Sequence, residues 1–279
     1  MASGPIDELV LIQPERGIPR LGARELWRRR ALFGFLVWRD IKLRYAQTLL
    51  GVAWVLLQPL LSMVIFAVIF GVLAGLPSDG APYPAFVLVG LVPWMFFSTA
   101  LGGASHSLLE NANLIGRVYF PRLFVPFAPA VSCFLDAGIA LAFLVPALAL
   151  AGLVPHPLAL IVVPLCILLA GATAAGVGSA LAALNLRYRD VRYVLPFLTQ
   201  AWMFASPVVY PASLVPETFR TLYALNPMVG VIEGCRWVLL DTPAPGAALL
   251  AASAASAALL LILGALYLRW AERSFIDVA

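Results

Sequence analysis

The stretch YAQTLLGVAWVLLQPLLSMVIFAVIFGVLAGLPS, from Tyr45 to Ser78, contains no Asp, Glu, Lys or Arg. A helix needs about 20 mostly apolar residues to cross the hydrocarbon core of a bilayer. Because this stretch exceeds that length, we predict a membrane-spanning helix over about residues 48–76. The rest of the fold depends on how often such stretches recur along the chain.

Four further stretches are uncharged or nearly so: Gly80–Leu109, Leu123–Leu186, Tyr193–Pro216 and Thr242–Leu268. Leu123–Leu186 is interrupted only by Asp136, and LVPHP at 153–157 divides it into two spans. We therefore predict an all-α integral membrane protein with six spans, at about 48–76, 84–109, 123–152, 158–184, 193–211 and 244–268. They make up a six-helix domain over 47–270, preceded by a cytoplasmic segment at 1–22 and an amphipathic helix at 23–46, and followed by a cytoplasmic tail at 271–279.

The composition excludes several classes of protein. Hydrophobic residues make up 62% of the 279 residues and charged residues 11%, whereas a soluble domain has about 25% charged residues. This is neither a soluble globular domain, nor a disordered chain, nor a nucleic-acid-binding arm. The only lysine, Lys42, follows Ile41, so the chain contains no G-x-x-x-x-G-K-[ST] loop for ATP phosphates. The two His and three Cys residues match no metal-binding spacing, so we expect no metal site.

The distribution of basic residues predicts the orientation. Sixteen of the 18 Lys and Arg residues precede the first predicted span or follow the second, fourth and sixth. Cytoplasmic loops carry an excess of Lys and Arg. Both termini are therefore expected in the cytoplasm.

Residues 23–46 do not fit a span. Their apolar run ALFGFLVW is too short, and basic residues flank it on both sides. We predict an interfacial helix along the cytoplasmic leaflet, with lipid headgroups contacted by Trp27, Arg28, Arg29, Arg30, Trp38, Arg39, Lys42 and Arg44.

Residues 212–241 are also unusual, because they are too apolar for a solvated loop and too broken for a span. Asn226-Pro227 divides the region in two. We predict two short re-entrant helices on the outer side, which require protein or a cavity around their ends. Asn226, Pro227, Glu233 and Arg236 are the residues expected to form an outer gate.

Ionisable residues within the spans are scarce, and no catalytic set is present, so we do not expect an enzyme. Asp136 has two open interpretations: a structural partner within the bundle, or a group that contacts substrate or couples transport. His106 is expected to be a polar residue near the cytoplasmic interface.

Aromatic residues on the first, second and fifth predicted spans have two interpretations as well. Carbohydrate C–H faces pack on aromatic rings, so a row of rings would provide a sequence-tolerant path. Lipid-facing belts and core packing are the alternative. The candidates for a channel lining are Trp54, Phe66, Phe70, Trp94, Phe97, Trp202, Phe204 and Tyr210.

Two predicted cytoplasmic loops have a distinctive composition. NANLIGRVYFPR (111–122) mixes amide, basic and aromatic residues, and NLRYRDVRY (185–193) alternates Arg, Tyr and Asp. Arg pairs well with carboxylates of a partner, whereas simple membrane anchoring needs charge alone. The residues expected to contact a cytoplasmic partner are Asn111, Asn113, Leu114, Ile115, Arg117, Tyr119, Phe120, Arg122, Arg187, Arg189 and Asp190.

A family resemblance rests on motifs along nearly the whole chain: FLVWRDIKLRYAQTLLG (35–51), W-x-x-x-QP (54–59), PSDG-x-PYP (77–84), GLVPWMFFS (90–98), NANLIGRVYFPR, RYRDVRYVLPF (187–197), SPVVYP (206–211) and LNPM-x-G-x-IEG-x-RW (225–237). In this order they resemble the permease subunits of ABC polysaccharide exporters. The pattern WRDIK-x-RY-x-QT-x-LG favours the branch that exports O-antigen over the capsule and teichoic acid branches.

The resemblance implies a bacterial inner-membrane homodimer with two copies of a separate ATPase subunit that binds ATP and Mg. It also implies that the amphipathic helix is a gate helix, that 111–122 is a coupling helix, and that 217–240 closes the channel. The substrate would be a lipid-linked polysaccharide entering from the cytoplasm. Arg28, Arg29 and Arg30 would meet its lipid diphosphate, or would anchor the helix to membrane lipid.

Other functions remain open at this point. A proton-driven secondary carrier would need inverted repeats and more buried acids, and a lipid-modifying enzyme would need a clustered acid, base or metal set. A small-molecule exporter of the same family would keep the fold and change the cargo.

Overall fold

The computed structural model describes residues 27–46, 51–115, 121–188 and 190–272. Within these ranges the chain consists of helices and turns without a β-strand. The predicted all-α class is therefore confirmed.

Five helices of the described chain are long and apolar enough to cross a membrane. They are α3 with its π-helical continuation η1 (Ala53–Phe66 and Ala67–Leu73), α4 (Tyr83–Glu110), α6 (Phe124–Leu150), α7 (Ala159–Arg187) and α11 (Ala247–Ala271). They coincide with the predicted first, second, third, fourth and sixth spans, so the protein is a multi-pass membrane protein.

The predicted fifth span differs from the structure. Residues 193–211 are helical only as part of α8 (Val191–Phe204), and turns follow from Ala205 to Tyr210. At 1.5 Å per residue, 14 residues reach about 21 Å, which is short of the roughly 30 Å hydrocarbon core. The Ser206-Pro207 step limits its length, because a residue before proline is disfavoured in helical conformation, and hydropathy alone does not detect this end.

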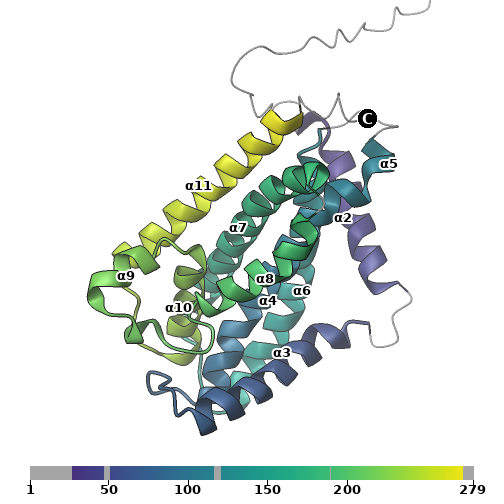
Figure 1. Cartoon of the computed structure of the whole chain (residues 1–279). Helices are drawn as coiled ribbons and strands as arrows, with labels where there is room; N and C mark the ends of the chain where they lie inside the picture. Colours follow the sequence, from purple (N-terminus) through teal and green to yellow (C-terminus); the bar gives the residue numbers. More distant parts are fainter. Residues whose placement is uncertain (1–26, 47–50, 116–120, 189, 273–279) are drawn as a thin grey trace, which may run out of the picture.

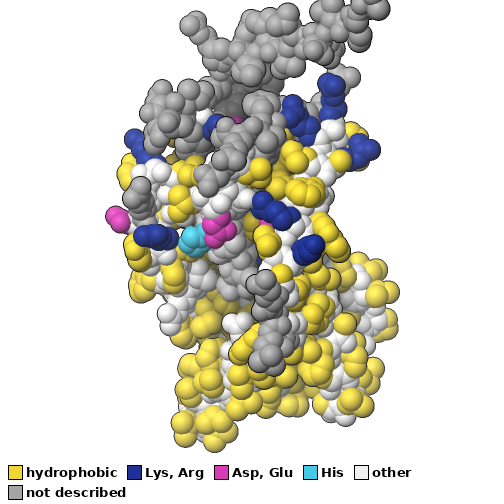
Figure 2. All heavy atoms as spheres, turned by 90° about the vertical axis from the view of Figure 1, so that its right-hand side faces the viewer, with side chains coloured by type: hydrophobic (Ala, Val, Ile, Leu, Met, Phe, Trp, Pro, Cys, Tyr) yellow, Lys and Arg dark blue, Asp and Glu magenta, His cyan; other side chains and the backbone are white. Residues whose placement is uncertain are grey.

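The long helices lie side by side (Figure 1), and the two ends of the bundle differ. We call the end at which α4 and α7 finish the basic end, because Arg122, Arg187 and Arg269 lie there. The opposite end, which carries α9 (Glu217–Tyr223) and α10 (Pro227–Leu240), is the hairpin end. Figure 2 shows Lys and Arg gathered over the upper part of one face, towards the basic end, while the lower part is hydrophobic.

The core is built around α4, which packs against α6, α7 and α10. Small residues bring two of the helices into backbone contact. A Cβ added at Gly264 of α11 would overlap the carbonyl oxygen of Gly176 in α7. Close approach at small residues is the usual way in which membrane helices gain packing contacts.

Helix α3 contributes little to this core. Its Pro59 is buried, whereas a row of apolar side chains on its other face is about half exposed: Leu61, Val64, Ile65, Val68 and Ile69. This face therefore adjoins lipid or another chain.

Helix α2 (Arg30–Tyr45) is the predicted amphipathic helix, but it packs lengthwise against α6. Near its start the Phe33 ring lies 5.2 Å from the ring of Phe124, the first residue of α6. In its last turn Arg44 bonds Asp136, halfway along α6. The helices therefore run in the same direction (Figure 1). The position of α2 along the leaflet remains a prediction, and its last turn has a partner halfway along α6.

The region after α8 contains the two predicted short helices, α9 and α10. Asn226 caps α10: its side chain accepts a hydrogen bond from Met228 N at 3.1 Å, and Pro227 occupies the first helical position, which needs no donor. Nearly all of α10 is buried against α4, α7 and α11. Protein covers this helix, as the prediction required, while its depth in the membrane remains a prediction.

Candidate functional site

Arg236 is the centre of the hairpin end. Its side chain is fully buried and its guanidinium donates to three backbone carbonyls: Phe86 O at 3.3 Å, Val208 O at 2.7 Å and Tyr210 O at 3.4 Å. It also lies 3.4 Å from the centroid of the Phe86 ring, a cation–π contact. One side chain of α10 thus holds the start of α4 and the turns after α8.

Glu233, one turn earlier in α10, balances this buried charge. Its Oε1 accepts from Arg236 Nη1 at 3.0 Å and from Ala212 N at 3.4 Å. Burial lowers the pKa of Arg236 to about 10 and raises the pKa of Glu233. The attraction between the two charges acts in the opposite direction on both pKa values, and burial has the larger effect. The predicted outer-gate residues Glu233 and Arg236 therefore form one buried ion pair.

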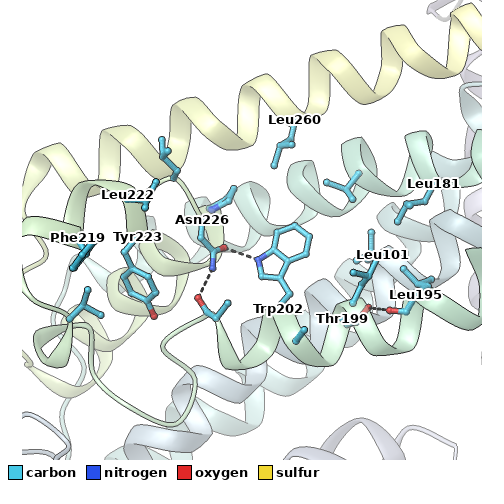
Figure 3. A pocket seen from close by; sticks show the side chains of 17 residues that line it. Leu101, Leu181, Leu195, Thr199, Trp202, Phe219, Leu222, Tyr223, Asn226 and Leu260 are labelled. Carbon is cyan, nitrogen blue, oxygen red and sulfur yellow. Dashed lines mark hydrogen bonds between the residues drawn. The ribbon is translucent and has the colours of Figure 1, made fainter.

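Asn226 joins α8 to α10 through both ends of its amide. Its Oδ1 accepts from Trp202 Nε1 at 2.9 Å, and its Nδ2 donates to Ser206 Oγ at 2.9 Å and to Ala205 O at 3.0 Å. Figure 3 shows the bond between Asn226 and Trp202 beside a largely apolar cavity between α8, α7, α11 and α9. The volume of this cavity is about 860 Å³. Trp202, predicted as a channel residue, thus also positions the hairpin.

The predicted aromatic set divides into buried and accessible rings. Trp94 and Phe97 are buried in the core of the chain, where Phe97 stacks edge-on against Trp202. They do not line an open path in this structure, because α4 is enclosed by its neighbours. Trp54 and Phe204 are about half exposed, and the intermediate rings are Phe66, Phe70, Trp202 and Tyr210. A channel role for these six remains a prediction.

Asp136 is paired within the bundle. Its carboxylate accepts from the Arg44 guanidinium and from the Tyr45 hydroxyl, and Arg44 donates in addition to Ser132 Oγ at 3.1 Å. Arg44 was predicted to contact lipid headgroups, but this ion pair turns it into the bundle. These bonds give Asp136 a structural role, and a contact between Asp136 and the substrate remains a prediction.

The rest of α2 is more accessible. Trp27 and Trp38 are 70% and 66% exposed, the Arg30 guanidinium lies over the Trp27 ring at 4.9 Å, and Arg39 bonds Asp40 at 2.8 Å. Exposed side chains here include Arg28 and Lys42, while Arg29 is half-buried. The predicted contact with headgroups remains a prediction for them.

The predicted cytoplasmic-partner residues lie at the basic end where they are described. Asn111 Nδ2 donates to Ser107 O at 2.8 Å, closing the end of α4, and α5 (Ala112–Ile115) follows with Leu114 half-buried. Arg122 Nη1 reaches Glu272 O at 3.5 Å. Outside the described residues or side chains fall Asn113, Ile115, Arg117, Tyr119, Phe120 and Arg189.

The second predicted loop is exposed. Arg187 lies over Tyr188 at 5.5 Å, and Arg192 lies over Tyr193 at 4.8 Å, while Asp190 is exposed as well. Asn185 of the same segment is buried and donates to Ser105 O at 3.2 Å, which fixes the end of α7 to α4. The loop therefore exposes Arg and Tyr side chains, while its first residue, Asn185, is held against α4.

Several residues of these sites were not predicted from the sequence. Tyr83 donates to Val209 O at 2.6 Å and so secures the same turns as Arg236, and the Phe86 ring lies against Arg236. Ser132 and Tyr45 belong to the Asp136 cluster. Ser132 lies one turn before Asp136 on the same helix face, so this spacing could have predicted that Ser132 belongs to the cluster.

These features define a class of protein. The polar groups join helices to each other, the described residues hold no group of three metal ligands, and the long helices are those of a membrane domain. This is the architecture of a multi-pass membrane protein, and residues 31–240 match the ABC-2 type transporter family.

The chain belongs to the ABC-2 type transporter family, as a permease. It is 31% identical over 242 residues to the O-antigen export system permease protein RfbA of Myxococcus xanthus, with 85% of this chain and 91% of that protein covered. A protein of the same name from Klebsiella pneumoniae is 26% identical over 203 residues, covering 73% and 78%. Polysialic acid transport protein KpsM of Escherichia coli is 24% identical over 199 residues, covering 70% and 76%.

Proposed function

We propose that this chain forms the channel of an ATP-driven exporter that moves a lipid-linked polysaccharide, O-antigen in particular, outward across the bacterial inner membrane. The observation that carries the proposal is the similarity to an O-antigen export permease over 85% of the chain. The similarity to polysialic acid transport proteins is weaker, at 24% identity, which favours O-antigen over a capsular polymer as cargo.

We propose that two copies of the chain enclose the channel. Two helices with little burial in one copy support this. The outward face of α3 is apolar and half exposed, and α8 exposes Tyr193, Phe197 and Phe204 while burying only Leu195. Faces of this kind gain packing contacts when they meet another chain. The accessible rings, Trp54 and Phe204 among them, would then border the path of the polymer.

The energy source in this proposal is a separate ATPase subunit, which binds ATP and Mg and is present in two copies. The sequence has no phosphate-binding loop of its own, and the basic end exposes Arg187, Arg192 and two adjacent tyrosines. Arg pairs with carboxylates in bidentate geometry. We expect the basic end, with both termini, to face the cytoplasm and the ATPase.

Deletion of the gene, followed by chemical analysis of the polymer that accumulates inside the cell, tests the cargo. Accumulated O-antigen on its lipid, removed by complementation with the wild-type chain, is the expected result. Accumulation of a capsular polymer would assign the alternative cargo, and no accumulation of any polysaccharide would refute the proposal.

Coupling to the ATPase is tested separately. The double variant Arg187→Ala/Arg192→Ala should lower both the amount of ATPase that co-purifies with the chain and the rate of ATP hydrolysis. Arg220→Ala at the hairpin end is the matched control, since its side chain is also exposed. Equal ATPase recovery and turnover in both variants would argue against this interface.

A further inference from the structure

A polar cluster lies midway along the membrane domain and is partly accessible. Asp136 is in the middle of α6, and the Asp136 and Arg44 side chains remain 18% and 28% exposed. An ionised group cannot face hydrocarbon at that depth, and intramembrane ionisable residues border cavities or other polar groups. The exposed part of this ion pair therefore needs a polar neighbour.

A cavity of about 230 Å³ adjoins the ion pair, between the end of α2, the start of α3, α4 and α6. Besides Arg44, Tyr45 and Asp136, its wall includes the polar side chains of Gln58 and Thr99. Both are exposed, and neither makes a side-chain hydrogen bond among the described residues. Gln58 belongs to a candidate span, and an amide without a hydrogen-bond partner is unfavourable in lipid.

The aromatic ring of Trp54 completes the cavity, in which it is half exposed. A carboxylate, a guanidinium, an amide and a hydroxyl around one aromatic ring offer donors, acceptors and an apolar face together. Because Asp136 neutralises Arg44, the cavity has no net positive charge for a phosphate group. The chemistry that fits is an uncharged ring with several hydroxyl groups.

We propose that this cavity is a binding site for a single sugar ring of the transported polymer. Gln58, Thr99 and the Arg44–Asp136 pair bond the hydroxyl groups, and the C–H face of the sugar lies against Trp54. The inference rests on the proposed function for the identity of the polymer. It adds a defined polar site between the end of α2 and the start of α3, distinct from the buried rings of Trp94 and Phe97.

Cysteine labelling tests the site in the intact complex, reconstituted in nanodiscs. Thr99→Cys places a thiol in the cavity wall, and Thr199→Cys is the matched control, because Thr199 borders the apolar cavity beside Trp202. Both variants are made in a Cys133→Ala background, because the free thiol of Cys133 borders this cavity, and that background serves as the blank. The probe is a charged methanethiosulfonate reagent, with or without the polysaccharide released from its lipid, or inorganic pyrophosphate.

We expect Thr99→Cys to react about ten-fold or more faster than Thr199→Cys, because apolar surroundings suppress the thiolate. The released polysaccharide should slow this labelling, and pyrophosphate should not. Adding Gln58→Leu should raise the polysaccharide concentration for half-protection roughly two- to ten-fold, the effect of one neutral hydrogen bond.

Three results would overturn the proposal: no labelling at position 99, labelling that the polysaccharide leaves unchanged, or protection by pyrophosphate instead. Failure of this inference is distinct from failure of the proposed function. If the deletion strain accumulates polysaccharide but the polysaccharide gives no protection at position 99, only the sugar site is wrong. If no polysaccharide accumulates, the proposed function is wrong, whatever the labelling shows.

Discussion

Replacing Arg236 by methionine should destabilise the protein more than any other single loss of charge at the hairpin end. Methionine fills similar space but donates no hydrogen bond. The change leaves Glu233 buried without its cation and withdraws the donor from two carbonyls that no helix satisfies, those of Val208 and Tyr210. Removing one partner of a buried ion pair alone costs about 3–5 kcal/mol, and each orphaned carbonyl adds to that cost.

The matched comparison is Arg220→Met. Arg220 and Glu217 have the same i,i+3 spacing in α9 as the Arg236–Glu233 pair in α10, but their side chains are 44% and 89% exposed and lie 3.5 Å apart. An exposed pair contributes about 0–1 kcal/mol. The two variants therefore separate the effect of burial from the effect of charge.

Thermal unfolding of the detergent-solubilised protein, followed by size-exclusion chromatography, measures the difference. For a chain of this size, a loss of about 3–5 kcal/mol lowers the melting temperature by about 10 °C, while Arg220→Met should change it by no more than a few degrees. The double variant Arg236→Met/Glu233→Leu should recover part of the loss, because no uncompensated carboxylate remains. Melting of Arg236→Met within a degree or two of Arg220→Met would refute the reasoning.

Three further changes test the packing and the tethers. Gly264→Ala should prevent α11 from closing on α7 and abolish the folded peak in chromatography, whereas Gly138→Ala, where no atom lies within 4 Å of the new Cβ, should behave as wild type; equal behaviour would contradict the backbone contact. Asn226→Ala should cost about 1–2 kcal/mol through its cap alone, and Asn226→Asp less, since Oδ1 remains; the reverse order of melting temperatures would argue against the cap. Tyr83→Phe removes the 2.6 Å bond to Val209 O and should cost about 1 kcal/mol, which an unchanged melting temperature would disprove.

The spans were predictable from the sequence because a membrane imposes its constraint locally. An uninterrupted apolar run such as that after Tyr45 has few other uses, and five of the six predicted runs became long helices. The failure at α8 is also local in origin: its last turn ends before Ser206-Pro207, while hydropathy remains high across this point. Apolar composition indicates what lipid tolerates and not where the helix ends.

The partners of the charged residues were not predictable in the same way. Arg44 and Asp136 are separated by 92 positions in the sequence, and Arg44 stands among other basic residues that suggest a headgroup contact. Nothing in the local pattern distinguishes the one arginine that turns into the bundle. The division of 212–241 at Asn226-Pro227 was predictable, because that dipeptide is itself a helix start.

The buried charges of this protein occur where helical backbone is interrupted inside the domain. The turns after α8 expose carbonyl groups that no helix satisfies, and Arg236 donates to two of them, at Val208 and Tyr210. Water would fill this role in a soluble protein, but in a membrane domain the protein itself must supply the donor. An arginine carries five donors in a fixed fork, so one such residue can hold turns that lysine or serine could not. The same reasoning applies where α2 ends: Arg44 and Tyr45 converge on Asp136 at the break before α3. The Arg236–Glu233 and Arg44–Asp136 pairs therefore both join a helix to a place where another helix stops.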